Sequence, residues 1–295
     1  MKAKTYPVIL FDGNGIAYRA FKGGDTVGGT LWRLLEAVER WRPEVTVMAW
    51  DAPDSREARL KYLPGYKGDR PPKEPDFYEA VAALERLLPL LGVLQCKVPG
   101  VEADDSMYTL SLEHEQCLIY SADKDLLQAL APGVHVYRPA MGNKDEQLVS
   151  LDNCEAVTGL KSTDWTGYLA LCGDKSDNIP GIKGLGDKTA KKILAVAPSF
   201  ISDALGGDMQ EESLIQLCEH APKLAKWFDK AVGPDRADLQ ASFNAVQLIY
   251  CDADEHMVPA APDRAAAERA MLDMGCSERL ISRWFKLIPD AAEDF

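Results

Sequence analysis

The sequence predicts an α/β fold in which a mostly parallel central sheet is flanked by helices and followed by a helical region. Two observations lead to this prediction. In the first half of the chain, short apolar runs alternate with amphipathic segments, which is typical of βαβ units. From about Asp152 onwards, the strand-like runs give way to helical periodicity. We therefore expect a sheet domain over residues 1–150 and a helical region over residues 151–295.

The elements of the sheet domain follow one another in the order that parallel pairing requires. The expected strands lie at 8–11, 45–50, 94–98, 116–121 and 133–139. The expected helices between them lie at 30–41, 79–92 and 102–115. In the helical region, residues 243–253 (FNAVQLIYCDA) are strand-like, so a return strand towards the sheet is expected there.

Residues 52–77 interrupt this alternation, because they are polar, basic and punctuated by Pro and Gly. Their composition favours a solvated connecting loop. A long basic loop beside a metal site can also clamp a substrate. Both interpretations stay open on composition alone.

The composition excludes several classes of protein. With 46% hydrophobic and 27% charged residues, the 295-residue chain is ordinary for a soluble globular protein. No apolar run approaches the roughly 18 residues of a membrane span, and the N-terminus is expected to be a first strand, not a signal peptide. The seven cysteines are widely spaced, without a CxxC pair. We therefore expect no zinc site, no disulfide framework and a reducing cytoplasm.

The net charge of −13 argues against nucleic-acid binding, because phosphate contacts need Lys and Arg. Two segments, residues 56–73 and 183–192, are nevertheless locally basic. If metal ions neutralise the acidic clusters described next, the average charge is a poor guide to the partner.

Acidic residues recur in five short clusters, most of them at the end of a strand-like run or the start of a helix. The nine residues are Asp12, Asp51, Glu102, Asp104, Asp105, Asp123, Asp125, Asp174 and Asp177. Taken singly, each cluster is explained by a helix cap or a turn. Taken together, they can converge at one sheet edge, where mutually repelling carboxylates need cations. Oxygen ligands suit Mg²⁺ or Mn²⁺, so the pattern predicts a multi-metal site for phosphate ester chemistry.

A second motif, IPGIKGLGDKTAKKIL, spans residues 179–194. Its glycines permit a tight hairpin, and a lysine-rich helix follows. Backbone N–H groups in such a turn, with a helix N-terminus behind them, bind phosphate oxygens. The spacing favours a helix-hairpin-helix DNA-binding motif over an ordinary Gly-rich turn. Its expected DNA contacts are Gly181, Lys183, Gly184, Gly186, Lys188, Thr189, Lys191 and Lys192.

Five segments of the chain resemble, in the same order, the 5′-nuclease family. This family includes flap endonucleases, bacteriophage 5′→3′ exonucleases and the 5′-nuclease domain of bacterial DNA polymerase I. The segments are FDGNGIAYRAF, LPGYKGDRPP, GVEADD, SADKDLLQ and GDKSDNIPGIKGLGDKTAKKIL, and they cover roughly residues 5–197. The resemblance implies a PIN-like sheet domain and a helix-hairpin-helix (H3TH) region. A stand-alone, phage-encoded enzyme is one expectation.

The resemblance also implies two metal sites. The first would be built mainly by Asp12, Asp51, Glu102 and Asp104. The second would be built mainly by Asp123, Asp125, Asp174 and Asp177. Asp105 would support one or both sites. Asp12 and Asp51 count as catalytic for this reason.

The cationic side of the site is implied by the same resemblance. Lys67 and Arg70 match the family's active-site lysine and the arginine beside it, which would stabilise charge on the scissile phosphate. In the family this segment forms a helical arch that admits a 5′ single strand; the Pro and Gly content here predicts a short arch. Tyr66 would stack on a base or be structural, and Arg19 would touch DNA or form a structural salt bridge. The hairpin would bind a monovalent cation, K⁺, through carbonyls of residues 184–186.

The implied activity is structure-selective hydrolysis of DNA phosphodiesters, as a 5′-flap endonuclease and 5′→3′ exonuclease that leaves 5′-phosphate and 3′-hydroxyl ends. Mg²⁺ is the implied cofactor, with Mn²⁺ as a substitute. The expected partners are DNA with 5′ flaps, nicks or free 5′ ends, and RNA in RNA–DNA hybrids. We expect a monomer without membrane contact, active in replication or repair in the cytoplasm of a bacterial or phage-infected cell.

Three other classes of protein compete with this interpretation. A phosphatase of the haloacid dehalogenase type needs a second Asp two residues after Asp12, where this chain has Asn14. A small PIN-type ribonuclease shares the acidic sheet edge but lacks the hairpin motif. A non-catalytic DNA-binding scaffold does not need nine acids facing one another, which is costly without metal.

Overall fold

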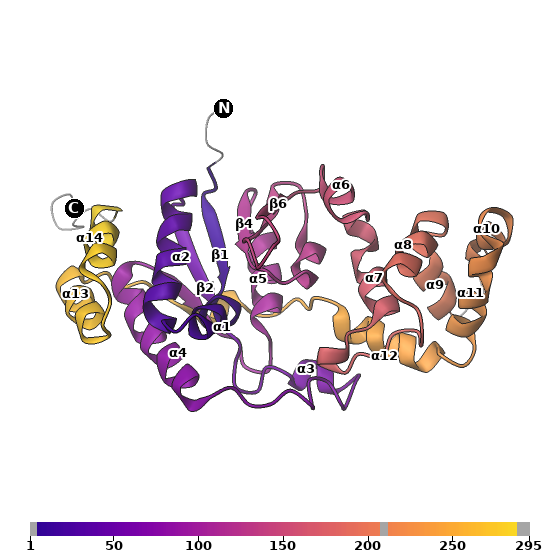
Figure 1. The fold of residues 1–295 in the computed structure, drawn as a ribbon, viewed down its shortest axis with the longest axis horizontal. Coiled ribbons are helices and arrows are strands. Elements are labelled where there is room, and N and C mark those ends of the chain that lie inside the picture. The colour runs from indigo at the N-terminus through magenta and orange to yellow at the C-terminus, as the bar shows by residue number, and fades with distance from the viewer. Residues whose placement is uncertain (1–4, 207–211, 288–295) are drawn as a thin grey trace. The chain divides into compact units, whose positions relative to one another are not determined.

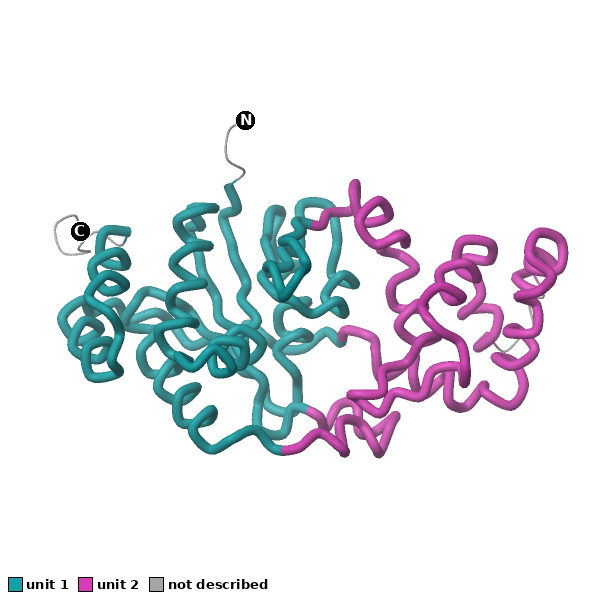
Figure 2. Tube along the Cα trace, in the orientation of Figure 1, with its two compact units in different colours: residues 1–55, 72–148, 249–295 teal, residues 56–71, 149–248 magenta. Residues whose placement is uncertain are grey.

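The computed structural model describes residues 5–206 and 212–287 of the chain. The chain divides into two compact units (Figure 2). The sheet unit consists of residues 1–55, 72–148 and 249–295, and the helical unit consists of residues 56–71 and 149–248. The chain passes from one unit to the other after residues 55, 71, 148 and 248, and the third of these positions lies near the expected boundary at residue 150. The segment 56–71 belongs to the helical unit, however, and the chain returns to the sheet unit after residue 248.

A seven-stranded sheet with the order β6-β5-β4-β1-β2-β3-β7 forms the centre of the sheet unit (Figure 1). The strands are β1 (Val8–Asp12), β2 (Val45–Ala49), β3 (Leu94–Cys96), β4 (Cys117–Tyr120), β5 (Val134–Arg138), β6 (Gln147–Val149) and β7 (Met257–Val258). β1 pairs in parallel with β2 and β4, β2 pairs in parallel with β3, and β4 pairs in parallel with β5. β7 is antiparallel to β3. The five predicted strands and the mostly parallel sheet are confirmed.

The middle strand of this sheet is apolar along its whole length because both of its faces are covered. Ile9, Leu10 and Phe11 are all 0% exposed, which is typical of a parallel strand with helices on both faces. The chain turns polar only at Asp12, where β1 ends. Functional side chains of the sheet unit therefore gather at the carboxyl ends of the strands, because the strand interiors are filled.

Six α-helices complete the sheet unit. They are α1 (Gly13–Lys22), α2 (Thr26–Trp41), α4 (Pro75–Leu87), α5 (Ala103–Leu112), α13 (Arg264–Asp273) and α14 (Glu278–Leu287). The first two have aspartate caps: the side chains of Asp12 and Asp25 accept hydrogen bonds from the backbone N–H groups of Gly15 and Gly28. The last two helices belong to the core, because Met271 of α13 and Trp284 of α14 are buried within it.

The helical unit contains eight α-helices among the described residues. They are α3 (Glu57–Leu60), α6 (Cys154–Thr158), α7 (Trp165–Cys172), α8 (Asp187–Val196), α9 (Phe200–Leu205), α10 (Glu212–His220), α11 (Ala225–Val232) and α12 (Arg236–Val246). α7 packs against both α8 and α12. A close backbone approach fixes the turn before α8: a Cβ on Gly181, whose φ is +61°, would lie 2.6 Å from the Gly173 nitrogen. Only glycine fits there.

The prediction of a return strand over residues 243–253 is wrong. Residues up to Val246 belong to α12, and the strand that returns to the sheet is β7, a two-residue strand at Met257–Val258. Two apolar residues at the start of this segment, Ala245 and Val246, are buried by helix packing and are 1% and 6% exposed. A short apolar run does not distinguish a buried helix from a strand.

Residues 56–71 of the segment predicted as an arch, 52–77, belong to the helical unit. They contain one short helix, α3, followed by turns. The Arg59 side chain is 3% exposed and donates its Nε to the carbonyl of Ala245 at 2.9 Å and Nη2 to that of Gln247 at 3.2 Å. A buried guanidinium bonded to the end of α12 anchors the segment. It is therefore more than a solvated connecting loop.

None of the helices in the described part of the chain has both the length and the apolar character needed to cross a membrane.

Candidate active site and nucleic-acid interface

The carboxyl ends of β1 and β2 hold the first two predicted site residues in fixed orientations. Asp12 accepts hydrogen bonds from the Gly15 N–H at 2.8 Å and from the Ser121 hydroxyl at 2.7 Å. Asp51 accepts one from the N–H of Ala103, the first residue of α5, at 3.0 Å. Helix N-terminal N–H groups thus orient both carboxylates, because each donor belongs to the first turn of a helix.

The first turn of α5 brings Asp104 towards the other carboxylates of this edge. Burial raises the pKa of Asp104 well above its usual range, and the negative charges of Asp123, Asp12, Glu102 and Asp51 raise it further. Burial likewise raises the pKa of Asp12, although its hydrogen bonds from Ser121 and Gly15 oppose the shift. Five of the nine predicted acids are therefore close enough to destabilise one another's charge.

Asp123 follows β4, and the loop that holds it is tied to Asp12 through one hydroxyl. The Ser121 side chain donates to Asp12 and accepts from the Asp123 N–H at 3.0 Å. Asp123 in turn accepts from the N–H of Asp125, which begins a short 3₁₀ helix, Asp125–Ala129. Ser121 is a residue that the sequence analysis missed, although its position directly before the SADKD acids was a usable signal.

Asp105 does not face this cluster. It is 0% exposed, and its Oδ1 accepts a hydrogen bond from the N–H of Ile249 at 2.9 Å. Its role in the structure is to hold the chain where it returns to the sheet unit. Asp104 and Asp105 are consecutive on a helix and point about 100° apart. That Asp105 supports a metal site stays a prediction.

The residues at this edge fit a divalent metal by chemistry and charge, though not as a preformed cage. Among the described residues, no group of three or more His, Cys, Asp or Glu side chains is arranged to hold a metal ion. The donors at the edge are nevertheless all carboxylate oxygens, which suit Mg²⁺ and Mn²⁺. Burial and the neighbouring acids disfavour the charged forms of Asp12 and Asp104 and raise their pKa values. A bound cation would supply compensating positive charge.

The helical unit holds the remaining predicted acids. Asp174 accepts hydrogen bonds from the N–H and the hydroxyl of Ser176 at 2.8 and 2.7 Å, so it acts as the cap of its own turn. Asp177 is 8% exposed and forms ion pairs with Arg70 and, at 3.9 Å, with the Lys67 ammonium. The structure therefore brings the two predicted catalytic cations to one predicted metal ligand.

Strained backbone marks the contact between the GYKGDR and GDKSDN segments. Lys67 and Asn178 are two of the three non-glycine residues with positive φ, at 51° and 58°, in the described part of the chain. The Lys67 N–H donates to the carbonyl of Asp177 at 2.9 Å, and Asn178 donates to the carbonyl of Gly65 and the carboxylate of Asp69, both at 3.0 Å. Such conformations cost about 1–3 kcal/mol each and cluster at functional sites.

Tyr66 takes the structural alternative. It is 4% exposed, and its ring lies 4.9 Å from the Lys67 ammonium and 5.9 Å from the Arg59 guanidinium. A base cannot stack on a ring that is buried in this way. The prediction of Tyr66 as a DNA-stacking residue is therefore wrong for this structure.

The predicted hairpin is present, but its residues differ in accessibility. Gly181 is buried and donates its N–H to the Ser242 hydroxyl at 2.9 Å, which corrects its assignment as a DNA contact. Gly184, with φ +84°, and Gly186, the N-cap of α8, are exposed. These two glycines remain available to approach a phosphate.

The lysines that follow the hairpin also differ. Lys188 and Lys192 are exposed, whereas Lys191 is half-buried and forms an ion pair with Asp187 at 3.0 Å. Asp187 also accepts a hydrogen bond from the Tyr168 hydroxyl at 2.8 Å; this bond, followed by that from Lys191, lowers the pKa of Asp187. An ion-paired lysine has less free charge to offer a phosphate.

One neighbour of the hairpin was not anticipated from sequence. Lys230 on α11 donates to the carbonyl of Lys183 at 2.7 Å, and the Trp227 ring lies 3.9 Å from the position of a Cβ on Gly184. The ammonium groups of Lys226 and Lys230 lie 5.1 and 5.2 Å from the Trp227 ring. α11 therefore adds positive charge beside the hairpin.

A mostly parallel sheet that ends in mutually repelling carboxylates, and a basic hairpin in the same chain, are features that the resemblance to the 5′-nuclease family implied. Comparison with family models agrees. The model of the 5′-3′ exonuclease N-terminal resolvase-like domain matches residues 7–159, and that of the 5′-3′ exonuclease C-terminal SAM fold matches residues 160–226. The chain belongs to the 5′-3′ exonuclease family. This membership argues against the phosphatase and the small PIN-type ribonuclease.

Curated relatives support the same family. The chain is 32% identical over 261 residues to a 5′-3′ exonuclease of Aquifex aeolicus, covering 83% of this chain and 82% of the relative. It is 36% identical over 202 residues to the thermostable DNA polymerase I of Thermus aquaticus, covering 63% of this chain. That match spans only 23% of the polymerase.

A solved structure shows the same fold. The flap endonuclease of bacteriophage T5, in a complex with DNA and metal ions, superimposes with a TM-score of 0.57. The match covers 95% of this chain and 96% of that chain at 16% sequence identity. The predicted fold class, an α/β sheet domain followed by a helical region, is therefore confirmed both by the model and by its structural neighbours.

Proposed function

We propose that this protein is a metal-dependent, structure-selective 5′-nuclease. It cleaves DNA phosphodiesters at 5′ flaps, nicks and free 5′ ends, and it leaves 5′-phosphate and 3′-hydroxyl products. The observation that carries the proposal is the convergence of carboxylates on Asp104, whose pKa is raised by burial and by four neighbouring acids. A protein retains such repulsion at neutral pH when a cation or a substrate-bound cation relieves it.

The carboxylates are proposed as ligands of Mg²⁺, for which Mn²⁺ would substitute. Asp12, Asp51, Glu102, Asp104 and Asp123 would hold the metal of the sheet edge. Asp125, Asp174 and Asp177 are the further proposed ligands. A divalent ion there would stabilise negative charge on the phosphoryl oxygens and activate water. The hydrogen bonds from Gly15 and Ser121 orient Asp12 and favour its charged form, against the opposing effect of burial.

Lys67 and Arg70 are proposed to neutralise the phosphate that is cut. Arg70 is held directly by Asp177, whereas the Lys67 ammonium is 3.9 Å from the same carboxylate. Both cations therefore lie at one carboxylate of the proposed metal site, and the Arg70 side chain is the more exposed of the two, at 49% against 18%. Positive charge placed in advance stabilises a transition state by a few kcal/mol, of the order of 3.

The hairpin and α11 are proposed to hold duplex DNA by its backbone. The exposed Lys183, Gly184, Gly186, Lys188 and Lys192 carry this role. Contacts of this type are independent of sequence, which suits an enzyme that selects by structure. K⁺ bound by carbonyls of residues 184–186 is part of the same proposal.

The same proposal covers the biological setting. The enzyme would act as a monomer in the cytoplasm of a bacterial or phage-infected cell, in replication or repair, and would also cut RNA in RNA–DNA hybrids.

An end-labelled 5′-flap duplex tests the proposal. With Mg²⁺ or Mn²⁺, the purified protein should release labelled 5′ products and leave 3′-hydroxyl ends that a polymerase can extend. EDTA should abolish the reaction. Absence of cleavage on flaps, nicks and free ends with either metal would refute the proposed function, and cleavage of RNA alone would favour a ribonuclease.

A further inference from the structure

A recess of about 360 Å³ opens beside Asp12 in the sheet unit. Besides Asp12 and Asp123, it is lined by three cationic side chains: Arg19 of α1, Lys124, and Arg138 at the carboxyl end of β5. The recess therefore extends from the proposed metal ligands towards β4 and β5, on the side of β1 opposite to β2. Its volume is about ten times the roughly 30 Å³ that one water occupies in the liquid.

Both arginines of the recess present a buried nitrogen that has no hydrogen-bond partner. These atoms are Arg19 Nη2 and Arg138 Nε. Neither side chain forms an ion pair with a carboxylate among the described residues. Burial lowers the pKa of Arg19, and the charge of Asp12 only partly opposes this shift. A buried donor without an acceptor costs about 1–3 kcal/mol, and more on a charged group, so two of them in one recess call for an acceptor.

The remaining contacts hold these side chains in place without neutralising them. Arg138 donates Nη1 to the Gln147 amide oxygen at 3.2 Å and Nη2 to the carbonyl of Ala122 at 3.4 Å. Arg19 donates Nε to the carbonyl of Gly15 at 3.4 Å. All three acceptors are uncharged. The two guanidinium groups are therefore oriented in advance, and their charge is still available to an anion.

We propose that this recess binds a phosphate of the DNA strand being cut, namely the phosphate next to the scissile one, with Arg138 and Arg19 as its ligands. The inference rests on the proposed function, because that function places the scissile phosphate at Asp12. Guanidinium groups bind phosphate oxygens through paired N–H donors, which is the contact that the two unpartnered nitrogens lack. Arg138 is thus a binding residue outside the acid clusters, the arch segment and the hairpin.

Binding without cleavage gives the first test. In EDTA, the affinity of Arg138→Gln for a fluorescent nicked duplex should be about tenfold weaker than that of the wild type, and the slope of log affinity against log salt should fall by about 1. Arg86→Gln, which removes an exposed arginine from α4, is the control for lost charge and should bind as the wild type does. Gln147→Ala removes the neutral partner of Arg138 and reports any purely structural effect.

Cleavage assays on nicked and flap substrates show whether the phosphate in the recess is a terminal monoester or an internal diester. On a nick, the neighbouring phosphate is the terminal monoester; on a flap, it is an internal diester. The wild type should cut a 5′-phosphorylated nick about tenfold faster than a 5′-hydroxyl nick, and Arg138→Gln should lose this ratio. Slowing of flap cleavage as well would show that the recess accepts a diester, whereas an effect on nicks alone would restrict it to the terminal phosphate.

Two results would overturn the recess proposal. One is equal binding and cleavage by Arg138→Gln and Arg86→Gln on all three substrates. The other is an equal loss in Gln147→Ala and Arg138→Gln, which would make Arg138 structural. A wild-type protein that cuts none of the substrates would instead refute the proposed function, so the two failures are distinguishable.

Discussion

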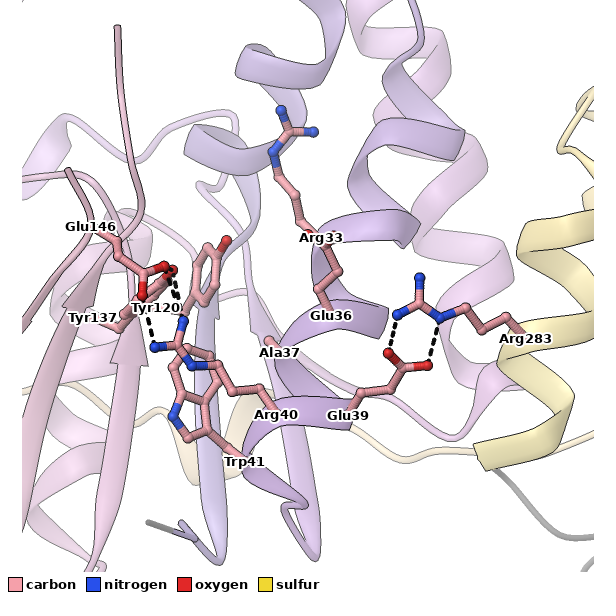
Figure 3. Close-up of a pocket in the computed structure, with 10 residues that line it drawn as sticks. All are labelled: Arg33, Glu36, Ala37, Glu39, Arg40, Trp41, Tyr120, Tyr137, Glu146 and Arg283. Carbon is pink, nitrogen blue, oxygen red and sulfur yellow. Dashed lines mark hydrogen bonds and ion pairs between the residues drawn. The ribbon is translucent and has the colours of Figure 1, made fainter. Parts of the chain in front are cut away.

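Arginines line two polar cavities of the sheet unit, and the arginines of the two cavities differ in the partners that their charges find. One is a cavity of about 420 Å³ lined by α2, β4, β5 and α14 (Figure 3). There, Arg40 pairs with both oxygens of Glu146 at 2.8 and 3.0 Å, and Glu146 also accepts from the Tyr137 hydroxyl at 2.6 Å. Arg283 pairs in the same two-pronged way with Glu39.

The other is the recess beside Asp12, where Arg19 and Arg138 have only neutral acceptors and each leaves one buried nitrogen without a partner. The comparison teaches that size and composition do not identify a ligand site. In the larger cavity, the charges of Arg40 and Arg283 are matched by Glu146 and Glu39. Arg33 bonds to the carbonyl of Gly29 and leaves no buried nitrogen without a partner among the described residues. In the smaller cavity, two buried guanidinium nitrogens have no acceptor. Unmatched charge that the fold holds in place is the better indicator of function.

The largest effect is expected from replacing Asp104, which lies among four other acids. Asp104→Asn should lower the cleavage rate about 10³-fold, because a proposed metal ligand is lost. It should also raise the melting temperature by a few degrees, roughly 1 kcal/mol, because burial and four neighbouring acids disfavour the ionised form of Asp104. Calorimetry in EDTA, beside a flap-cleavage assay, checks both parts. An Asp104→Asn protein that is less stable than the wild type and fully active would contradict both expectations.

The next effect concerns Lys67, which faces Asp177. Lys67→Ala should slow single-turnover cleavage about 10²-fold while DNA binding changes much less, since the ammonium is proposed to act on the transition state. Single-turnover rates and anisotropy titrations separate the two quantities. Equal losses in both would make Lys67 a simple phosphate anchor. Lys67→Arg keeps the charge and should recover part of the rate.

The hairpin lysines repeat the contrast on a smaller scale. Lys191 is ion-paired with Asp187, whereas Lys188 is exposed and has no ion pair in the described chain. Lys188→Gln should therefore weaken duplex binding a few-fold and lower the salt slope by about 1, and Lys191→Gln should do less. Titrations at several salt concentrations would show it. A larger loss of duplex binding in Lys191→Gln than in Lys188→Gln would mean that DNA displaces Asp187 from Lys191.

The smallest effect is expected in the cavity of Figure 3, where Glu146 pairs with Arg40. The hydrogen bond from Arg40, followed by that from Tyr137, lowers the pKa of Glu146. A lowered pKa contributes stability that is present above the unfolded value, about 4.3, and that is lost as pH falls through the folded value. Both side chains of the pair are nearly half exposed, so Glu146→Gln should cost less than about 1 kcal/mol at pH 7 and nothing at pH 3. Its nuclease activity should equal that of the wild type; denaturant titrations at both pH values provide the test.

Much of the sheet edge could be predicted from the sequence. Asp12 and Asp51 each end an apolar strand, and parallel strands bring such residues together. The hydrogen bond from the Ile249 N–H to Asp105 could not be predicted, because it joins residues far apart in the sequence. The burial of Tyr66 could not be foreseen, because the polar segment around it gives no sign of the anchor at Arg59.

Arg138 shows the limit of sequence reasoning most clearly. An arginine after a strand is ordinary, and nothing in YRP distinguishes it from a surface residue. Its significance depends on one nitrogen that is buried without an acceptor, which only coordinates reveal. The misassigned strand at 243–253 has the same cause, because tertiary packing decided between helix and strand in a short apolar segment.

The division of the chain between its two units also has a consequence for synthesis. The core of the sheet unit includes Met271 and Trp284, although its first strand begins at Val8. The helical unit, whose last residue is 248, is complete in sequence well before that core can close. On the ribosome, then, the part of the core that α13 and α14 complete can close only after residues beyond 264 emerge. Until that point the apolar side chains that these two helices cover are open, and transiently exposed surface of this kind is what makes a nascent chain prone to aggregation.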